Sequence, residues 1–367
     1  MKLAYLVNIR YPSERANAIQ ITAMCNAFAA NGVEVTLFTN RRTRESKSEA
    51  EQYFGIPLHF TLKRLPQGLF IPGVQATYLF SELFFATFFW LSGAAKRFDV
   101  VYSRQEWVLY FLSFVVNRDK LVWESHEAKL NLPARRLLRR RIKTVVISEG
   151  IREAYEHFGV LQTQMLVAHD GIDEDMLQPS EDKAQVRARL GLPQDKKIAM
   201  YIGGFDAWKG VETFFQASRL CTDVTFAAIG GSMEQLKNLS HEYPSVQFLG
   251  PRPYSELKNN QQAADVLVVP NTAKNQLSAA YTSPLKLFAH LASGVPLVIS
   301  DVPSLTIVTG REKVTVFVPD DAADLAEKIT QTLENPYART YAEELRSDAV
   351  KYTWTKRVSE ILNFIRQ

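Results

Sequence analysis

One stretch, residues 198–216, constrains the fold of this chain more than any other. It opens with an apolar run of the kind that forms a buried parallel strand. Gly203 and Gly204 follow at once and allow the backbone to turn sharply beside a ligand. Lys209 comes next, ahead of apolar residues at helical spacing. This order predicts either an anion site for a diphosphate or an ordinary strand–turn–helix with a surface lysine.

The same alternation of strand and helix runs through the rest of the chain. Leu3–Val7 and Val33–Thr39 are predicted strands, and the apolar spacing between them predicts a helix. Repeated units of this kind predict an α/β protein with parallel sheets and helices on both faces. In such sheets ligands bind beyond the carboxyl ends of the strands.

The length of the chain, 367 residues, exceeds what one ordinary core needs and suits two domains. A polar connector follows Asp170-Gly-Ile-Asp173 and marks a boundary there. We therefore predict two Rossmann-like domains, residues 1–172 and 173–345, that face each other across a substrate cleft.

Composition narrows the class further. Hydrophobic residues make up 46% of the chain and charged residues 22%, as in globular proteins. The net charge of +4 is mild, and we expect no nucleic-acid partner. The two cysteines, Cys25 and Cys221, have neither disulfide nor zinc spacing. Because no Asp-x-Asp metal signature stands out either, we expect no metal and no cofactor.

Two features concern membranes and location. The most apolar stretch, Leu69–Ala95, contains Glu82 and Gly93, so we expect a buried or membrane-surface helix rather than a spanning one. The first residues lead directly into a strand without the pattern of a signal peptide, and a cytoplasmic location is expected.

Polar residues follow the predicted strands of the first half. Arg10, Asn17 and Gln20 come after the first strand, and Arg104 ends the strand that starts near Asp99. Their position places them on the rim where this kind of sheet binds ligands. Arg10 taken singly also fits a solvated loop charge.

His126 follows another predicted strand and lies between Glu124 and Glu127. A lone histidine is usually structural, but this one is expected at the ligand edge of the sheet. A neighbouring carboxylate raises the pKa of an imidazole and orients the ring. We therefore predict a site role for His126.

A basic helix is predicted from Pro133 to Lys143. Its five arginines and one lysine surround Leu137, Leu138 and Ile142. Such a helix fits either a solvated surface or contact with anionic lipid, where each basic residue contributes about 1 kcal/mol. A peripheral place on the inner face of a membrane is therefore one expectation.

A second helix start with anion-binding character lies further on. Thr282 and Ser283 precede a predicted helix in which Pro284 suits the first position and Lys286 lies in the first turn. Two such helix starts in one half suit a diphosphate that is bound from both sides.

These motifs resemble the family-4 retaining glycosyltransferases, which have the GT-B fold. The resemblance covers nearly the whole chain. The Ser283-Pro-Leu-Lys286 variant is similar to a subgroup that acts on polysaccharide or glycolipid precursors. The segments that carry the resemblance are Gly203–Gly210, Ser283–Pro296, His126 after a strand, and Asp170–Asp173.

The resemblance implies retaining transfer of a sugar from a nucleotide-sugar donor in the C-terminal half to a glycan or lipid-linked acceptor in the N-terminal half. It implies that His126 contacts the donor sugar or stabilises developing charge and that Lys209 stabilises the leaving diphosphate. It also implies a C-terminal helix, residues 346–367, that crosses back to the first domain. The expected acceptor side is Arg10, Asn17, Gln20, Arg104 and Glu124. The expected donor side is Gly203, Gly204, Lys209, Arg252, Thr282, Ser283, Pro284, Leu285 and Lys286.

The chain departs from the family pattern at three positions. Gly204 occupies the place of the usual phosphate-loop arginine, whose charge Lys286, Arg252 or Arg10 would have to supply. Tyr281 and Ala289 stand where the family carries two glutamates. These departures favour an alternative, a non-catalytic sugar-nucleotide or glycan-binding protein on the same scaffold. An epimerase would need paired carboxylates in the cleft, which the pattern lacks.

Overall fold

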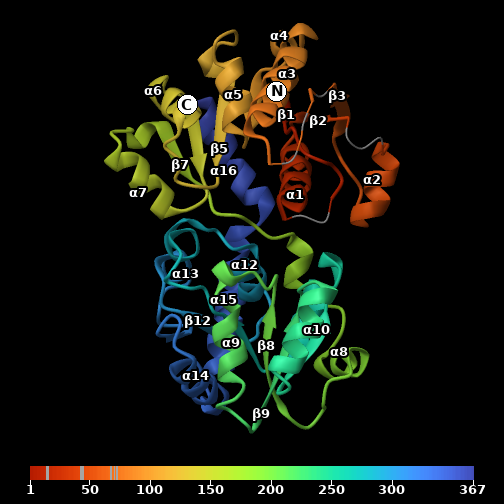
Figure 1. Ribbon diagram of the computed structural model, residues 1–367, viewed down its shortest axis with the longest axis vertical. Helices are drawn as coiled ribbons and strands as arrows, with labels where there is room; N and C mark the ends of the chain where they lie inside the picture. The colour runs from red at the N-terminus through yellow and green to blue at the C-terminus, as the bar shows by residue number, and fades with distance from the viewer. Residues whose placement is uncertain (14–15, 42–44, 67, 70, 72) are drawn as a thin grey trace. The chain divides into compact units, whose positions relative to one another are not determined.

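The computed structural model describes residues 1–13, 16–41, 45–66, 68–69, 71 and 73–367. The chain divides into two compact units (Figure 1). Unit 1 is Met1–His169 together with Trp354–Gln367, and unit 2 is Asp170–Thr353. The sequence placed the corresponding boundaries after residues 172 and 345, so residues 346–353 lie in unit 2 rather than with the tail.

Within its described residues, unit 1 is built on a seven-stranded parallel sheet in the order β3-β2-β1-β4-β5-β6-β7. The inner strands are buried throughout, which explains their apolar runs. The strands are β1 Lys2–Leu6, β2 Glu34–Asn40, β3 Thr61–Leu65, β4 Val100–Ser103, β5 Leu121–Ser125, β6 Lys143–Val146 and β7 Met165–Val167.

The helices of unit 1 include one from the far end of the chain. The C-terminal helix α16 packs against α1, and α5 packs against both α3 and α6. The helices are α1 Ala16–Ala30, α2 Lys47–Phe54, α3 Gln75–Leu91, α4 Ala94–Arg97, α5 Glu106–Leu112, α6 Leu132–Arg139, α7 Glu149–His157 and α16 Trp354–Arg366.

Unit 2 contains a six-stranded parallel sheet in the order β10-β9-β8-β11-β12-β13. Buried apolar residues on its two faces form two core clusters. The strands are β8 Lys197–Ile202, β9 Val224–Ile229, β10 Val246–Gly250, β11 Val266–Val269, β12 Leu297–Ser300 and β13 Thr315–Phe317. The helices are α8 Lys183–Leu190, α9 Val211–Ala217, α10 Met233–Glu242, α11 Leu257–Asn260, α12 Leu285–Leu291, α13 Pro303–Thr309, α14 Ala322–Glu334 and α15 Ala338–Ala349.

The two ends of unit 2 lie side by side. Ile172 and Thr353 form a parallel β-bridge, and the amide of Ile172 donates to the carbonyl of Tyr352 at 2.9 Å. The chain therefore enters and leaves unit 2 at one place.

The basic segment differs from its prediction. Helix α6 ends at Arg139, and Arg141 adopts a left-handed conformation with φ 56°. Lys143 belongs to β6, where its Nζ donates to the carbonyls of Phe364 and Ile365 at 3.1 and 2.7 Å. The predicted continuous helix to Lys143 is therefore wrong, because the chain turns at Arg141 to enter the sheet.

Two other predictions about helices can be compared with the structure. Pro284 is the N-cap of α12 rather than its first residue, and no side chain caps this helix. Within the apolar stretch from Leu69 to Ala95, Gln75–Leu91 forms α3, and no helix of the described residues is long and apolar enough to span a bilayer.

Candidate active site

His126 lies just beyond the carboxyl end of β5 and is held by a buried carboxylate. Its Nε2 is 2.6 Å from Oε1 of Glu124, whose side chain is fully buried, whereas the His126 side chain is 18% exposed. The two residues are separated by one position, so their side chains leave the end of the strand on the same side. This contact fixes the orientation of the imidazole ring.

Several elements converge on Glu124. Nε2 of Gln20 donates to it at 2.7 Å from α1, and the hydroxyl of Tyr102 donates to it from β4. Arg357 of α16 is 3% exposed and places Nη2 3.4 Å from the carboxylate. Nε and Nη2 of Arg357 also donate to the carbonyl of Ala168, each at 3.2 Å. The C-terminal helix therefore helps to position the carboxylate that orients His126.

The charge state of Glu124 follows from these contacts. Burial alone would raise the pKa of its carboxyl group, but the opposing charge of Arg357, aided by His126 and Arg104, outweighs burial. The pKa of Glu124 is held well below its usual range, so the carboxylate is ionised beneath the imidazole.

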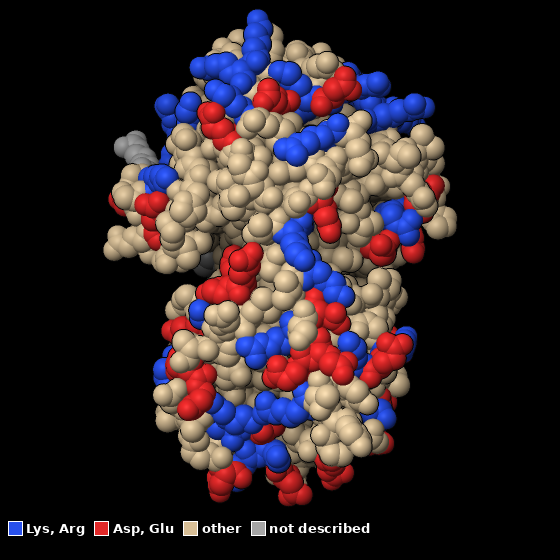
Figure 2. Space-filling model, turned by 180° about the vertical axis from the view of Figure 1, so that it is seen from behind, with Lys and Arg blue, Asp and Glu red and all other residues tan. Residues whose placement is uncertain are grey.

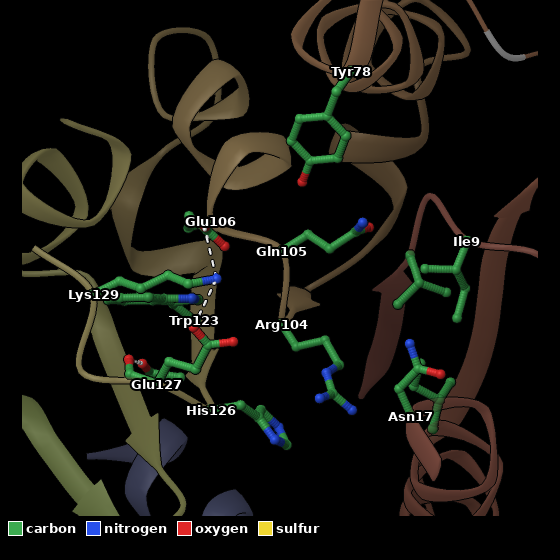
Figure 3. A pocket seen from close by; sticks show the side chains of 13 residues that line it. Ile9, Asn17, Tyr78, Arg104, Gln105, Glu106, Trp123, His126, Glu127 and Lys129 are labelled. Atoms are coloured by element: carbon green, nitrogen blue, oxygen red, sulfur yellow. Dashed lines mark hydrogen bonds and ion pairs between the residues drawn. The ribbon is translucent and has the colours of Figure 1, made fainter. Parts of the chain in front are cut away.

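A pocket of about 210 Å³ opens beside His126. Figure 3 shows Arg104 and His126 near one another, with Asn17 across from them and Tyr78 of α3 further along the wall. Lys129 closes one side through ion pairs with Glu106 at 3.8 Å and Glu127 at 3.2 Å.

The structure brings most of the predicted acceptor side together. Asn17 and Arg104 line the pocket, whereas Gln20 and Glu124 lie buried beneath it. Nη1 of Arg104 donates to Oε1 of Gln20 at 2.8 Å, which joins the two groups. Arg10 is exposed and is not among the described residues that line this pocket.

In unit 2 the two glycine pairs that follow β8 and β9 lie against each other. The amide of Gly203 donates to the carbonyl of Ile229 at 2.9 Å. A Cβ on Gly230, which has φ 128°, would come within 2.0 Å of the Gly203 carbonyl oxygen. Only glycine allows this approach of backbones.

Lys209 folds back over the glycine turn. Its Nζ forms an ion pair with Oδ2 of Asp206 at 2.7 Å. A Cβ on Gly204 would lie 2.6 Å from this Nζ and 3.0 Å from the Asp206 oxygen. The space next to Gly204, where the glycosyltransferases that the sequence resembles carry arginine, is therefore filled by the Lys209–Asp206 pair.

Lys286, in the first turn of α12, points into the same region. Its Nζ is buried without a hydrogen-bond partner among the described residues and lies 4.9 Å from the ring centre of Tyr201. The hydroxyl of Tyr201 in turn donates to the carbonyl of Gly204 at 2.8 Å. Burial, with a smaller effect from Lys209, lowers the pKa of Lys286 to about 7.

His290 lies one helical turn beyond Lys286 and is fully buried. Its Nδ1 is 2.7 Å from Oε1 of Gln261. Burial, with a smaller effect from Lys286, lowers the pKa of His290 to about 3, so the ring is neutral. This environment indicates an internal polar contact rather than a binding surface.

The remaining predicted donor residues occupy varied environments. Ser283 is buried, and its Oγ accepts a hydrogen bond from the amide of Asp170 at 2.8 Å. Thr282 and Pro284 are half-buried just before α12, Leu285 is half-buried at its first position, and Arg252 is exposed beyond β10. The described residues contain no group of three or more His, Cys, Asp or Glu placed to hold a metal ion.

Sequence reasoning missed Arg357, Tyr102, Tyr78 and Lys129. Arg357 meets Glu124 only because α16 returns to unit 1. Tyr78 lines the pocket from a helix and Lys129 lines it from a loop, and neither residue belongs to a recognisable sequence motif. The apolar pattern of the tail predicted a helix, but no local signal shows which carboxylate its arginine meets.

Comparison with known proteins finds that this chain is similar to glycosyltransferases. Residues 196–335, which carry the glycine turn, Lys209 and Lys286, match the family described as Glycosyl transferases group 1. D-inositol 3-phosphate glycosyltransferase from Corynebacterium aurimucosum is 28% identical over 243 residues, which is 60% of this chain and 56% of the relative. The protein of that name from Mycobacterium leprae is 25% identical over 214 residues, which is 55% of this chain and 48% of the relative. The chain thus spans about half the length of these curated relatives.

Several solved structures superpose on nearly the full length of this chain. Sucrose-phosphate synthase from Thermosynechococcus elongatus superposes with a TM-score of 0.78 at 22% identity, covering 100% of this chain and 98% of that one. HepE from Anabaena, in complex with UDP and glucose, gives a TM-score of 0.73 at 15% identity and covers 99% of each chain. The predicted fold class is confirmed: the chain has two Rossmann-like α/β domains of the GT-B type.

Proposed function

We propose that this protein is a retaining glycosyltransferase of the family-4 type, in the subgroup with the Ser283-Pro-Leu-Lys286 variant. It transfers a hexosyl group from a nucleotide sugar to a glycan or lipid-linked acceptor in polysaccharide or glycoconjugate synthesis. The family match of residues 196–335 and the names of the relatives support this activity.

One observation supports the donor assignment most directly. The Nζ of Lys286 is buried beside the glycine turn without a partner among the described residues, and Lys209 adds a second positive charge nearby. The protonated form of such a buried amine is stabilised by an anion. The diphosphate of a nucleotide sugar is an anion of suitable charge, and its departure would be assisted by the same two groups.

The acceptor assignment rests on the pocket in unit 1. Trp123 Nε1 and Asn17 Oδ1 line or border this pocket and have no partner among the described residues. A buried donor and a buried acceptor together suit the hydroxyl groups of a sugar, each of which both donates and accepts. His126, oriented by Glu124, would face the sugar that is being transferred.

Two further parts of the proposal concern conditions and location. We expect transfer without a metal ion, and activity retained in excess EDTA would agree with this. We also expect a cytoplasmic protein that touches an anionic membrane through the exposed arginines of 135–143. Arg135, Arg139 and Arg141 are exposed, but the apolar residues of α6 other than Leu132 are buried, so this helix would contribute charge more than insertion.

The alternative is a non-catalytic sugar-nucleotide or glycan-binding protein on the same scaffold. It is favoured by Gly204, Tyr281 and Ala289 at positions where the related family carries arginine and two glutamates. A thermal-shift screen with uridine, guanosine, adenosine and cytidine sugar nucleotides should identify the donor base. Nucleotide release from that donor then separates the two functions: turnover supports the transferase, and binding without release supports the alternative.

A further inference from the structure

Helix α3 has an outward face that differs from that of an ordinary surface helix. It buries Ser81, Glu82, Phe85, Ala86 and Phe89 on one side. The opposite side exposes Phe80, Leu83, Trp90 and Leu91 by 49%, 43%, 44% and 64%. The single charged residue of the helix, Glu82, is on the buried side. A helix exposed to water normally presents a polar outer face, so the apolar face of α3 indicates a non-aqueous neighbour.

The apolar surface continues beyond α3. Helix α5 packs against α3 and is followed by Phe114 and Val115, which are 57% and 52% exposed. The segment that leads into α3 exposes further apolar side chains, Leu69, Ile71 and Val74. We call the residues Leu69, Ile71, Val74, Phe80, Leu83, Trp90, Leu91, Phe114 and Val115 the α3 surface.

Positively charged side chains border the α3 surface near Ser92, which follows α3, and near Phe114. Nη2 of Arg97 donates to the carbonyl of Ser92, directly after α3, at 2.7 Å. Lys120 Nζ donates to the carbonyl of Phe98 at 2.9 Å. The guanidinium of Arg136 lies 3.6 Å from the ring centre of Phe114. Figure 2 shows many Lys and Arg side chains over the upper part of unit 1, with a few Asp and Glu side chains among them.

Apolar side chains bordered by cations fit a membrane that carries negative headgroups. We propose that the α3 surface rests in the interface of an anionic bilayer, with Arg97, Lys120 and Arg136 at the level of the lipid phosphates. The helix lies on the bilayer, since no helix of the described residues is long and apolar enough to cross it.

The position of α3 also deepens the proposed function, on which this part of the inference rests. Tyr78 belongs to α3 and lines the pocket that contains His126 (Figure 3). Tyr78 lies on the same side of α3 as the buried Glu82 and Phe85, so this one helix contributes to the pocket wall and presents the apolar face on its opposite side. An acceptor sugar carried on a lipid could occupy the pocket while its lipid stays in the bilayer beside α3. We infer that the acceptor is lipid-linked.

Vesicle flotation of the full chain tests the surface. A variant with Phe80→Ser, Trp90→Ser and Leu91→Ser should lose binding to phosphatidylcholine–phosphatidylglycerol vesicles by on the order of tenfold or more. A matched control with Leu220→Ser, Met233→Ser and Ile307→Ser removes equally exposed side chains of unit 2 and should bind as the wild type does. Arg97→Gln should weaken binding only to vesicles that contain phosphatidylglycerol. Equal melting temperatures establish that the variants are folded.

Depth of insertion gives an independent readout. Brominated lipid should quench tryptophan emission of the wild type, and Trp90→Phe should remove much of this quenching. Absence of vesicle binding by the wild type, or equal binding by the α3 variant, would overturn the inference. Conversion of a dimer to a monomer by that variant would also overturn it, because a second copy would then cover α3.

The acceptor class is tested by transfer to one sugar acceptor with and without a lipid anchor in vesicles. We expect the α3 variant to lose transfer to the anchored form and to keep its donor-induced thermal shift. Equal transfer to both forms would overturn the lipid-linked assignment alone. Failure of every donor to bind would instead overturn the proposed function.

Discussion

The polar clusters of the two units differ in how their charges are balanced. In unit 1, Glu124 accepts or pairs with Gln20, Tyr102, His126 and Arg357. In unit 2, the Nζ of Lys286 has no partner among the described residues, and its positive neighbour, Lys209, opposes its protonation. The first cluster is complete without a ligand, whereas in the second Lys209 pairs with Asp206 and the buried amine of Lys286 has no partner among the described residues. Under the proposed function, unit 1 would orient the imidazole toward the transferred sugar and unit 2 would bind the diphosphate.

The largest expected effect comes from removing a cation of unit 2. Lys209→Ala should lower kcat by on the order of 10²–10³, as does loss of a preorganised group that stabilises a developing charge. Steady-state nucleotide release measures this. Lys183→Ala is the matched control, because Lys183 also forms a 2.7 Å ion pair, with Asp265, and it lies on α8. Near-normal turnover of Lys209→Ala would remove the phosphate assignment.

The next effect tests whether the tail acts on the site of unit 1. Arg357→Lys keeps the charge but loses the planar guanidinium, which serves both Glu124 and Ala168. We expect kcat/KM to fall about tenfold, or about 1.4 kcal/mol. In the wild type the charge of Arg357 lowers the pKa of Glu124 and so counteracts the effect of burial. A weaker contact with lysine should therefore raise this pKa, and the acidic limb of the pH profile should move to higher pH.

Arg187→Lys separates this effect from simple loss of stability. Arg187 is also 3% exposed, donates to a backbone carbonyl, that of Ala263, and pairs with a carboxylate, Asp265, at 2.7 Å. It contacts neither the pocket nor the glycine turn in any described interaction. Its substitution should lower the melting temperature and leave the pH profile unchanged. Identical pH profiles for both lysine variants would show that Arg357 is only structural.

Proton uptake on binding of a diphosphate should distinguish the Lys286 cluster of unit 2 from the Glu124 cluster of unit 1. The pKa of Lys286 is about 7, so at about pH 8 the amine is mostly neutral in the unliganded protein. A bound diphosphate favours the charged form and raises this pKa, so binding should take up a fraction of one proton. Calorimetry of UDP, or of the diphosphate of whichever base binds, in buffers of different ionisation enthalpy measures this uptake. Lys286→Met should abolish it, and His126→Gln should not.

The smallest effect is expected at the glycine that replaces the family arginine. Gly204→Ala introduces a Cβ 2.6 Å from the Nζ of Lys209, which has to move. Because this Nζ ends a flexible side chain, the protein should remain folded and donor affinity should fall only a few-fold, by roughly 1 kcal/mol. A titration followed by thermal shift measures the change. An unchanged affinity would show that Lys209 adopts another position when the donor binds.

Much of the fold follows from local pattern. The buried strands and the glycine turn after β8 are visible as apolar runs and paired glycines, because a parallel sheet covered on both faces needs both features. The Glu124–His126 contact is also visible, since the two residues are close in sequence at the end of one strand.

Other parts of the site depend on packing that local sequence does not specify. Arg357 meets Glu124 only after α16 docks on α1, and Lys286 is deprived of partners only by burial beside Tyr201. The end of α6 was missed because a left-handed residue, Arg141, stops the helix where glycine would normally mark the stop.

The β-bridge between Ile172 and Thr353 has a consequence for biosynthesis. Unit 2 is an insertion whose two ends meet, so all of its residues leave the ribosome before Arg357 does. The chain can thus complete unit 2 before unit 1 is complete. The imidazole of unit 1 receives its final support only when the last helix has been made.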